Sequence, residues 1–162
     1  MSRCYLDTNF LYVHLRSPRP QSPKAIEQWQ ASVLAEVTVD GGVISALVLD
    51  ELAYKLILAW LRDDGAQDPL SAYRADTHKT MRDVRTRLTK VWRAVNSLSL
   101  ELQQTDSAVV QQAQSLMASP GLGPRDAFHA AHALAAGCPL IASPDTAFDE
   151  VPGLQRLAPL NE

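Results

Sequence analysis

Short apolar segments alternate with longer helical segments along the chain, and this alternation constrains the fold more than any other feature of the sequence. The predicted strands are Arg3–Leu6, Val43–Ile44, Leu98–Leu102, Pro139–Ala142 and Leu154–Leu157. The predicted helices cover residues 10–16, 72–96, 106–117 and 126–136. Two more are expected: one begins at Ser22-Pro23, and the other is capped by Ser45 and ends near Arg62. Strands separated by helices pair in parallel, and the helices cover both faces of the sheet. We therefore expect a three-layer α/β/α sandwich with a central, mostly parallel sheet.

The size and composition of the chain fit one globular domain. It has 162 residues, of which 46% are hydrophobic and 20% are charged, and a chain of this length can bury a core without disulfides. We expect a single domain over residues 1–162. The net charge of −3 excludes a protein whose whole surface attracts nucleic acid, so any phosphate-binding surface must be local or supplied by metal.

The two cysteines and the amino-terminal residues indicate a cytoplasmic protein. Cys4 and Cys138 lie in apolar runs without a Cys-x-x-Cys pair, which predicts buried free thiols in a reducing compartment. Asp7 follows Met1 too closely for a signal peptide. No apolar run approaches the roughly 18 residues that a membrane span needs, so we expect no membrane contact.

Four carboxylates occur at positions where a parallel sheet gathers its ligands. Asp7 and Asp145 each follow a predicted strand, Glu51 lies in the second turn of a helix, and Asp126 opens a helix. Ligands bind outside the carboxyl ends of parallel strands, so we expect these side chains to converge. Clustered carboxylates repel each other unless a cation joins them, and oxygen ligands favour Mg²⁺ or Mn²⁺. Such an ion polarises a phosphodiester and lowers the pKa of water, which predicts a phosphodiesterase.

The sequence blocks that contain these acids also resemble a known family. The blocks are Asp7-Thr8-Asn9, Ile44 to Leu52, Pro124 to Ala131, and Leu140 to Phe148 with Val151 to Leu154 after it. In this order they resemble the PIN-domain nucleases, in particular the VapC-type toxins of bacterial toxin–antitoxin pairs. The resemblance covers nearly the whole chain. Ser143-Pro144 replaces the threonine-rich stretch expected before the fourth acid, which leaves the conformation of that loop open.

The resemblance implies a metal-dependent endoribonuclease. Its metal ligands and catalytic residues would be Asp7, Glu51, Asp126 and Asp145, its cofactor Mg²⁺ or Mn²⁺, and its substrate RNA, cleaved to leave a 5′-phosphate. It also implies a cognate antitoxin that inserts a segment near the acids. Small apolar helices near the amino terminus favour a homodimer.

Several neighbours of the acids have two interpretations each. Thr8 and Asn9 either orient Asp7 by hydrogen bonding or cap the helix that follows. Ser45 either hydrogen-bonds near the metal or caps its helix. Asp149, one turn after Asp145, either helps to hold a second metal or lies on the surface.

Three further residues compete with this ligand set. Asp50 precedes Glu51, but the spacing of six residues from the serine and the phase of the helix favour Glu51. His129 and His132 follow Asp126 at helical spacing, which allows a transition-metal site of one aspartate and two histidines. The apolar helix around them favours the alternative that His129 packs beneath the site.

A basic segment is the part of the sequence where local charge can attract RNA. Seven of the 15 basic residues fall within residues 74–93. The candidate RNA contacts are Lys79, Arg82, Arg85 and Lys90. The alternative is a solvated helix face. Trp60 and Trp92 can stack on bases, although packing between helices is the favoured interpretation.

Two other functions remain open. A PIN-fold module that has lost catalysis would bind RNA or protein only, and a housekeeping nuclease would process RNA without an antitoxin. A phosphotransfer enzyme or phosphatase with Asp7 as nucleophile is disfavoured, because no second aspartate follows two residues later and no P-loop glycine motif is present.

Overall fold

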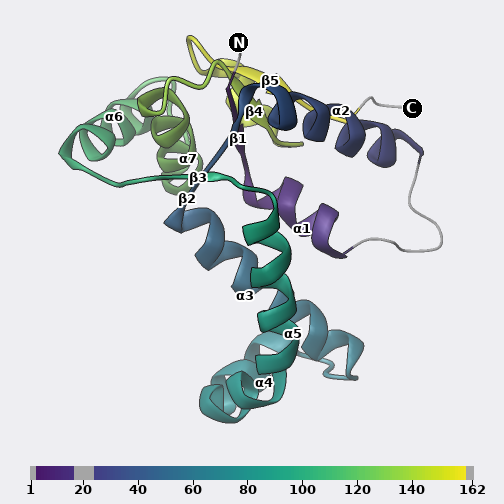
Figure 1. The fold of residues 1–162 in the computed structure, drawn as a ribbon. Helices are drawn as coiled ribbons and strands as arrows, with labels where there is room; N and C mark the ends of the chain where they lie inside the picture. Colours follow the sequence, from purple (N-terminus) through teal and green to yellow (C-terminus); the bar gives the residue numbers. More distant parts are fainter. Residues whose placement is uncertain (1–2, 17–23, 160–162) are drawn as a thin grey trace.

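The computed structural model describes residues 3–16 and 24–159, and its centre is a single sheet (Figure 1). The strands run in the order β3-β2-β1-β4-β5, and every neighbouring pair is parallel. They are β1 (Cys4–Leu6), β2 (Gly42–Ser45), β3 (Glu101–Gln103), β4 (Leu140–Ala142) and β5 (Gln155–Leu157). The expected parallel sheet is confirmed, and in the described residues it contains no antiparallel pair.

Helices cover both faces of this sheet and give the three layers expected from the sequence (Figure 1). The helices are α1 (Thr8–Arg16), α2 (Lys24–Asp40), α3 (Ala46–Asp63), α4 (Pro69–Ala75), α5 (Thr77–Ser97), α6 (Ser107–Ala118) and α7 (Pro124–Ala135), with a short 3₁₀ helix η1 (Thr146–Glu150). α7 packs against β2 and β4 with α6 beside it, while α2 packs against β1 and β2. None of the described helices is both long enough and apolar enough to cross a membrane.

A helical arm extends away from the sheet (Figure 1). We use this name for residues 57–90, which comprise α4 and the adjoining parts of α3 and α5. The arm has a small core of its own, in which Ile57, Val84 and Leu88 are buried. Trp60 and Trp92 pack against both this core and the main core under the sheet. Their position agrees with helix packing, the interpretation favoured from the sequence.

The buried cysteines agree with the sequence prediction, because Cys4 and Cys138 are free and lie in the main core. Burial raises the pKa of Cys4 to about 12 and that of Cys138 to about 11. Both thiols are therefore inert parts of the core.

The predicted edge strand at Leu98–Leu102 starts too early. α5 continues to Ser97, Leu98 closes its last turn, and Ser99 takes a positive φ of 51° before the chain reaches β3 at Glu101. Leu98 and Leu100 do pack against the main core. Both residues lie in the loop between α5 and β3 rather than in the strand. The alternation of apolar and polar residues continues through this loop, so it suggested a strand that starts too early.

The predicted helix over residues 72–96 is confirmed as helical but is not continuous, since this region forms α4 and α5 with a break at Asp76. Asp76 has an extended φ of −152°, and its carboxylate accepts a hydrogen bond from the backbone nitrogen of Lys79 at 2.8 Å. Aspartate is a preferred residue at such a helix start. The helix start predicted at Ser22-Pro23 lies outside the described residues.

Candidate active site

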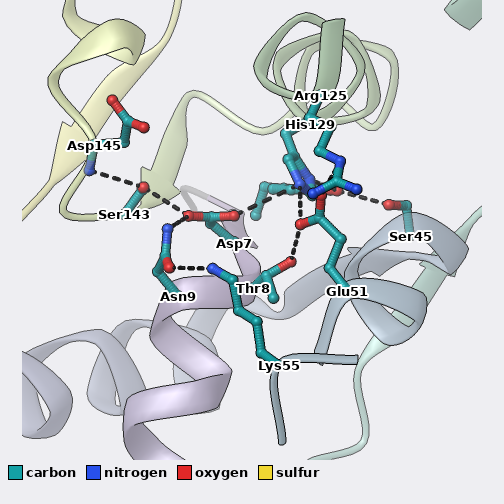
Figure 2. Close-up of polar contacts among 11 residues, drawn as sticks. Asp7, Thr8, Asn9, Ser45, Glu51, Lys55, Arg125, His129, Ser143 and Asp145 are labelled. Carbon is teal, nitrogen blue, oxygen red and sulfur yellow. Dashed lines mark hydrogen bonds and ion pairs between the residues drawn. The ribbon is translucent and has the colours of Figure 1, made fainter. Parts of the chain in front are cut away.

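Asp7 and Glu51 meet where β1 and β2 end (Figure 2). Asp7 directly follows β1, and Glu51 projects from α3, which begins directly after β2. Both side chains are almost fully buried, with 3% of Asp7 and 8% of Glu51 exposed. The sequence predicted that four acids converge at the carboxyl ends of the strands, and Asp7 and Glu51 are the two of them whose ligand atoms lie together in one group.

One oxygen of Asp7 is held by two hydrogen bonds. Oδ2 accepts from the Ser143 hydroxyl at 2.7 Å and from the Asn9 amide at 3.0 Å. Ser143 reaches this position because β1 and β4 are adjacent and parallel, with Leu6 paired to Ala142. The other oxygen, Oδ1, accepts no hydrogen bond from the described residues and lies 3.7 Å from His129 Nε2. Asp7 thus has one anchored oxygen and one that can take a ligand.

Glu51 is arranged in the same way. Its Oε2 accepts hydrogen bonds from Thr8 Oγ1 at 2.8 Å and from His129 Nε2 at 3.1 Å. Its Oε1 lies 3.3 Å from Nε of Arg125, whose side chain is 72% exposed. Burial alone would raise the pKa of Glu51, but the hydrogen bonds from His129 and Thr8, with the charges of His129 and Arg125, lower it to about 2. The carboxylate is therefore ionised at neutral pH.

His129 connects the two acids to the interior of the protein. Its Nδ1 lies 3.0 Å from the Tyr5 hydroxyl, which in turn lies 2.8 Å from the Ser45 hydroxyl. The ligand atoms of Asp7, Glu51 and His129 lie within 4.8 Å of one another. His129 is 2% exposed, and its Nε2 contacts both acids, so it belongs to the same group of possible metal ligands.

His132 lies elsewhere on α7. Its Nε2 is 3.2 Å from Thr105 Oγ1, whereas Nε2 of His129 contacts Glu51. Because the two rings have different partners, the geometry does not support the alternative metal site of one aspartate and two histidines.

The remaining two acids lie around this pair. Asp126 is in the first turn of α7, which starts two residues earlier than predicted because Pro124 occupies the first helical position. Burial and the negative charges of Asp145, Asp7 and Glu51 raise the pKa of Asp126, and His129 partly opposes them. The charges of the other three carboxylates therefore act on Asp126.

Asp145 has a structural role that the sequence did not reveal. Its carboxylate accepts a hydrogen bond from the backbone nitrogen of Ala147 at 2.9 Å and so caps η1. Its own backbone nitrogen donates to the Ser143 hydroxyl at 3.1 Å. In Figure 2 its carboxylate lies apart from those of Asp7 and Glu51.

The residues present fit a divalent cation. Asp7 and Glu51 offer buried carboxylates. Oδ1 of Asp7 accepts no hydrogen bond from the described residues, and Oε1 of Glu51 is paired with Arg125, whose side chain is 72% exposed. Burial, and after it the negative charge of Asp145, raises the pKa of Asp126 in the same region. Several carboxylates around one point suit a hard ion such as Mg²⁺ or Mn²⁺.

Three other residues considered from the sequence lie outside this pair. Ser45 occupies the N-cap position directly before α3, but its hydroxyl makes no cap hydrogen bond and contacts Tyr5 instead. Asp50 is exposed, in agreement with the preference for Glu51. Both oxygens of Asp149 bind Arg156, at 2.8 and 2.7 Å, in an exposed ion pair that agrees with the surface interpretation.

The basic residues nearest the acids are not those singled out from the sequence. Lys79, Arg82, Arg85 and Lys90 are exposed on α5, and most of that stretch belongs to the helical arm, which points away from the sheet (Figure 1). Lys55 and Arg125 lie next to Glu51 instead (Figure 2). The sequence contained a signal for both, because Lys55 is one helical turn after Glu51 and Arg125 directly precedes Asp126.

Comparisons with known proteins agree with this architecture. No curated protein sequence matches the chain at a significant level. The crystal structure of FitAcB from Neisseria gonorrhoeae is similar, with a TM-score of 0.57, 21% identity and coverage of 96% of this chain and 97% of that one. The crystal structure of VapBC2 from Rickettsia felis, bound to a DNA fragment from the promoter of these proteins, is also similar. Its TM-score is 0.55 and its sequence identity 15%, and the match covers 95% of this chain and 96% of that one. At these identities the likeness shows the fold.

A protein-family model gives a more specific assignment than the two structures do. The model of the PIN domain matches residues 4–154 of this chain. The matched range begins in β1, just before Asp7, and extends past Asp145. The chain therefore belongs to the PIN domain family.

Proposed function

We propose that this protein is a Mg²⁺- or Mn²⁺-dependent endoribonuclease and the toxin of a type II toxin–antitoxin pair. The observation that carries the proposal is the arrangement of Asp7 and Glu51. Both carboxylates are buried, and each has one oxygen fixed by two hydrogen bonds. We propose that a cation binds the other oxygens, Oδ1 of Asp7 and Oε1 of Glu51, the latter in place of its ion pair with the exposed Arg125. Membership of the PIN domain family supports a nuclease.

In this proposal Asp7, Glu51, Asp126 and Asp145 hold the cation. A bound Mg²⁺ or Mn²⁺ would supply Lewis-acid activation of the scissile phosphodiester and of water. The protein's contribution is orientation, because partners that hydrogen-bond to metal ligands fix their position and basicity. Those partners are Ser143 and Asn9 for Asp7, and Thr8 and His129 for Glu51.

The toxin assignment rests on the resemblance of the four sequence blocks to VapC-type toxins and on the similarity in fold to VapBC2 and FitAcB. We accordingly propose a cognate antitoxin that reaches the acids, a homodimer, and action on RNA in the cytoplasm. The supporting likeness extends over 95% of this chain or more in both structures.

RNA cleavage by the purified protein tests the nuclease proposal. We expect cleavage of total RNA with Mn²⁺ or Mg²⁺, none with EDTA, and none by Asp7→Asn with metal present. Glu36→Gln, on the exposed surface of α2, is the matched control and should cleave like the wild type. Turnover by Asp7→Asn equal to the wild type, or cleavage that survives EDTA, would contradict the site. A wild type that binds Mn²⁺ without cleaving RNA would identify the chain as a non-catalytic PIN module.

Induced expression in a bacterial host tests the toxin proposal separately. Growth should stop on expression of the wild type and continue with Asp7→Asn. Normal growth with an active nuclease would identify a housekeeping enzyme.

A further inference from the structure

We propose that the pocket lined by Glu51, Tyr54, Lys55 and Arg125 binds the RNA nucleotide next to the scissile phosphate. Lys55 and Arg125 would contact its phosphate, and the ring of Tyr54 would stack on its base. This inference rests on the proposed ribonuclease function and names the part of the substrate that the same site recognises.

The pocket is continuous with the acid site. It has a volume of about 280 Å³ and is lined by Asp50, Glu51, Tyr54, Lys55 and Arg125. Glu51, Tyr54 and Lys55 are spaced three and four residues apart on α3, so they share one face of that helix. Arg125 reaches the pocket from α7. Glu51 therefore belongs both to the wall of this pocket and to the carboxylate pair, and an occupant of the pocket lies beside the reacting group.

The cations of this pocket are available to a substrate. Lys55 Nζ contacts the amide oxygen of Asn9 at 2.6 Å and makes no ion pair with a described carboxylate. Arg125 approaches Glu51 through Nε, and among the described residues its two terminal nitrogens have no partner. In a protein of net charge −3 these cations can offset the repulsion between the acids and an RNA backbone.

Tyr54 adds an aromatic surface next to the two cations. It is 36% exposed, and the edge-to-face contact with Tyr73, at 5.8 Å and 84°, supports its ring from α4. Aromatic rings that accompany basic groups are the usual means by which proteins bind single-stranded nucleic acid, because every base has a π-face.

The size of the pocket favours a single nucleotide of an RNA strand over a free small molecule as its occupant. Its volume of about 280 Å³ lies just below the range of roughly 300–1,000 Å³ typical of sites that enclose a whole small ligand. A nucleotide within a strand needs only partial enclosure, because its neighbours are held elsewhere on the protein.

The salt dependence of RNA binding tests the two cations. We would measure the anisotropy of a fluorescein-labelled single-stranded RNA of mixed sequence in EDTA, which prevents metal-dependent cleavage. The slope of log K against log salt should fall in magnitude by about 0.7 for each lost phosphate contact to a single strand, in Lys55→Gln and in Arg125→Gln. Lys55→Arg should restore the slope. Arg62→Gln, exposed two turns further along α3, is the matched control and should match the wild type.

Two substitutions test the stacking surface. Tyr54→Leu keeps an apolar side chain but removes the ring, and we expect binding to weaken roughly 10-fold, within the range for loss of one stacked base, with an unchanged salt slope. Tyr54→Phe should bind like the wild type. In cleavage assays with Mn²⁺, Tyr54→Leu and Arg125→Gln should raise KM more than they lower kcat.

The outcomes separate this proposal from the nuclease assignment. Wild-type slopes in both cation variants, or wild-type affinity in Tyr54→Leu, would overturn the pocket even if the protein cleaves RNA. Altered slopes in a protein that never cleaves RNA with Mn²⁺ would support the pocket as an RNA site and reject the nuclease.

Discussion

Nε2 of His129 lies 3.1 Å from Oε2 of Glu51, at the end of a row of buried polar groups that begins at Ser45. The hydroxyls of Ser45 and Tyr5 lie 2.8 Å apart, and the Tyr5 hydroxyl lies 3.0 Å from Nδ1 of His129, so each neighbouring pair in the row is within hydrogen-bonding distance. The orientation of a carboxylate on α3 is thus set by residues of β1, β2 and α7, which makes the site dependent on the assembled fold.

Thr8→Val should lower stability and metal affinity together. The substitution keeps the shape of a fully buried side chain but removes its 2.8 Å hydrogen bond to Glu51 Oε2. A hydrogen bond to a charged group contributes about 1.5–3 kcal/mol, so the free energy of unfolding in urea should fall by that amount. Thr8→Ser keeps the hydroxyl and should lose much less. Equal unfolding curves for Thr8→Val and the wild type would show that this hydrogen bond does not contribute.

Ser143→Ala should weaken metal binding more than it weakens the fold. The Ser143 hydroxyl donates to Asp7 Oδ2 and accepts from the backbone nitrogen of Asp145, so it links two proposed ligands. Loss of such a supporting group costs about 10- to 100-fold in metal affinity, measurable by calorimetric titration with Mn²⁺. Ser115→Ala is a suitable control, because among the described residues the Ser115 hydroxyl bonds to the Gln111 carbonyl of its own helix α6. The role given to Ser143 is wrong if both variants bind Mn²⁺ equally well.

The stability of the metal-free protein should depend on pH through Glu51. Its pKa falls from 4.5 to about 2 on folding. A lowered pKa stabilises the fold above pH 4.5, and this contribution is lost as the pH falls toward 2, because the unfolded state then binds the proton first. The shift corresponds to about 3 kcal/mol. In urea unfolding with EDTA, the wild type should lose stability more steeply than Glu51→Gln between about pH 4.5 and pH 2, whereas parallel curves would contradict the lowered pKa.

The sequence predicted the sheet and the meeting of Asp7 with Glu51, because both follow from local patterns. An acid directly after an apolar strand must lie at the end of that strand, and parallel strands end together. Ser143 could not be identified in the same way. Its contact with Asp7 depends on β4 pairing with β1, and strand order is a property of the whole fold.

The basic residues near the acids were likewise not singled out from the sequence. The charge pattern of residues 74–93 drew attention to α5, because density along the sequence is visible without a structure. Lys55 is a neighbour of Glu51 on the same helix, whereas Arg125 comes close to Glu51 only when α7 packs near α3. The break at Asp76 and the start of β3 were missed for a local reason, since apolar and charged spacing continue through both boundaries.

Gly42→Ala tests the packing at the start of β2, from which α3 and Glu51 are positioned. A Cβ atom at Gly42 would lie 2.5 Å from Leu100 Cδ2 and 2.8 Å from Val37 Cγ1, so both side chains would have to move. Overpacking of this kind costs about 1–3 kcal/mol, and we expect a lower free energy of unfolding. Leu100→Ala removes one of the two obstructing groups, so the cost of Gly42→Ala should be smaller in the Leu100→Ala background. An equal cost in both backgrounds would show that Leu100 does not limit this position and that Val37 or the backbone does.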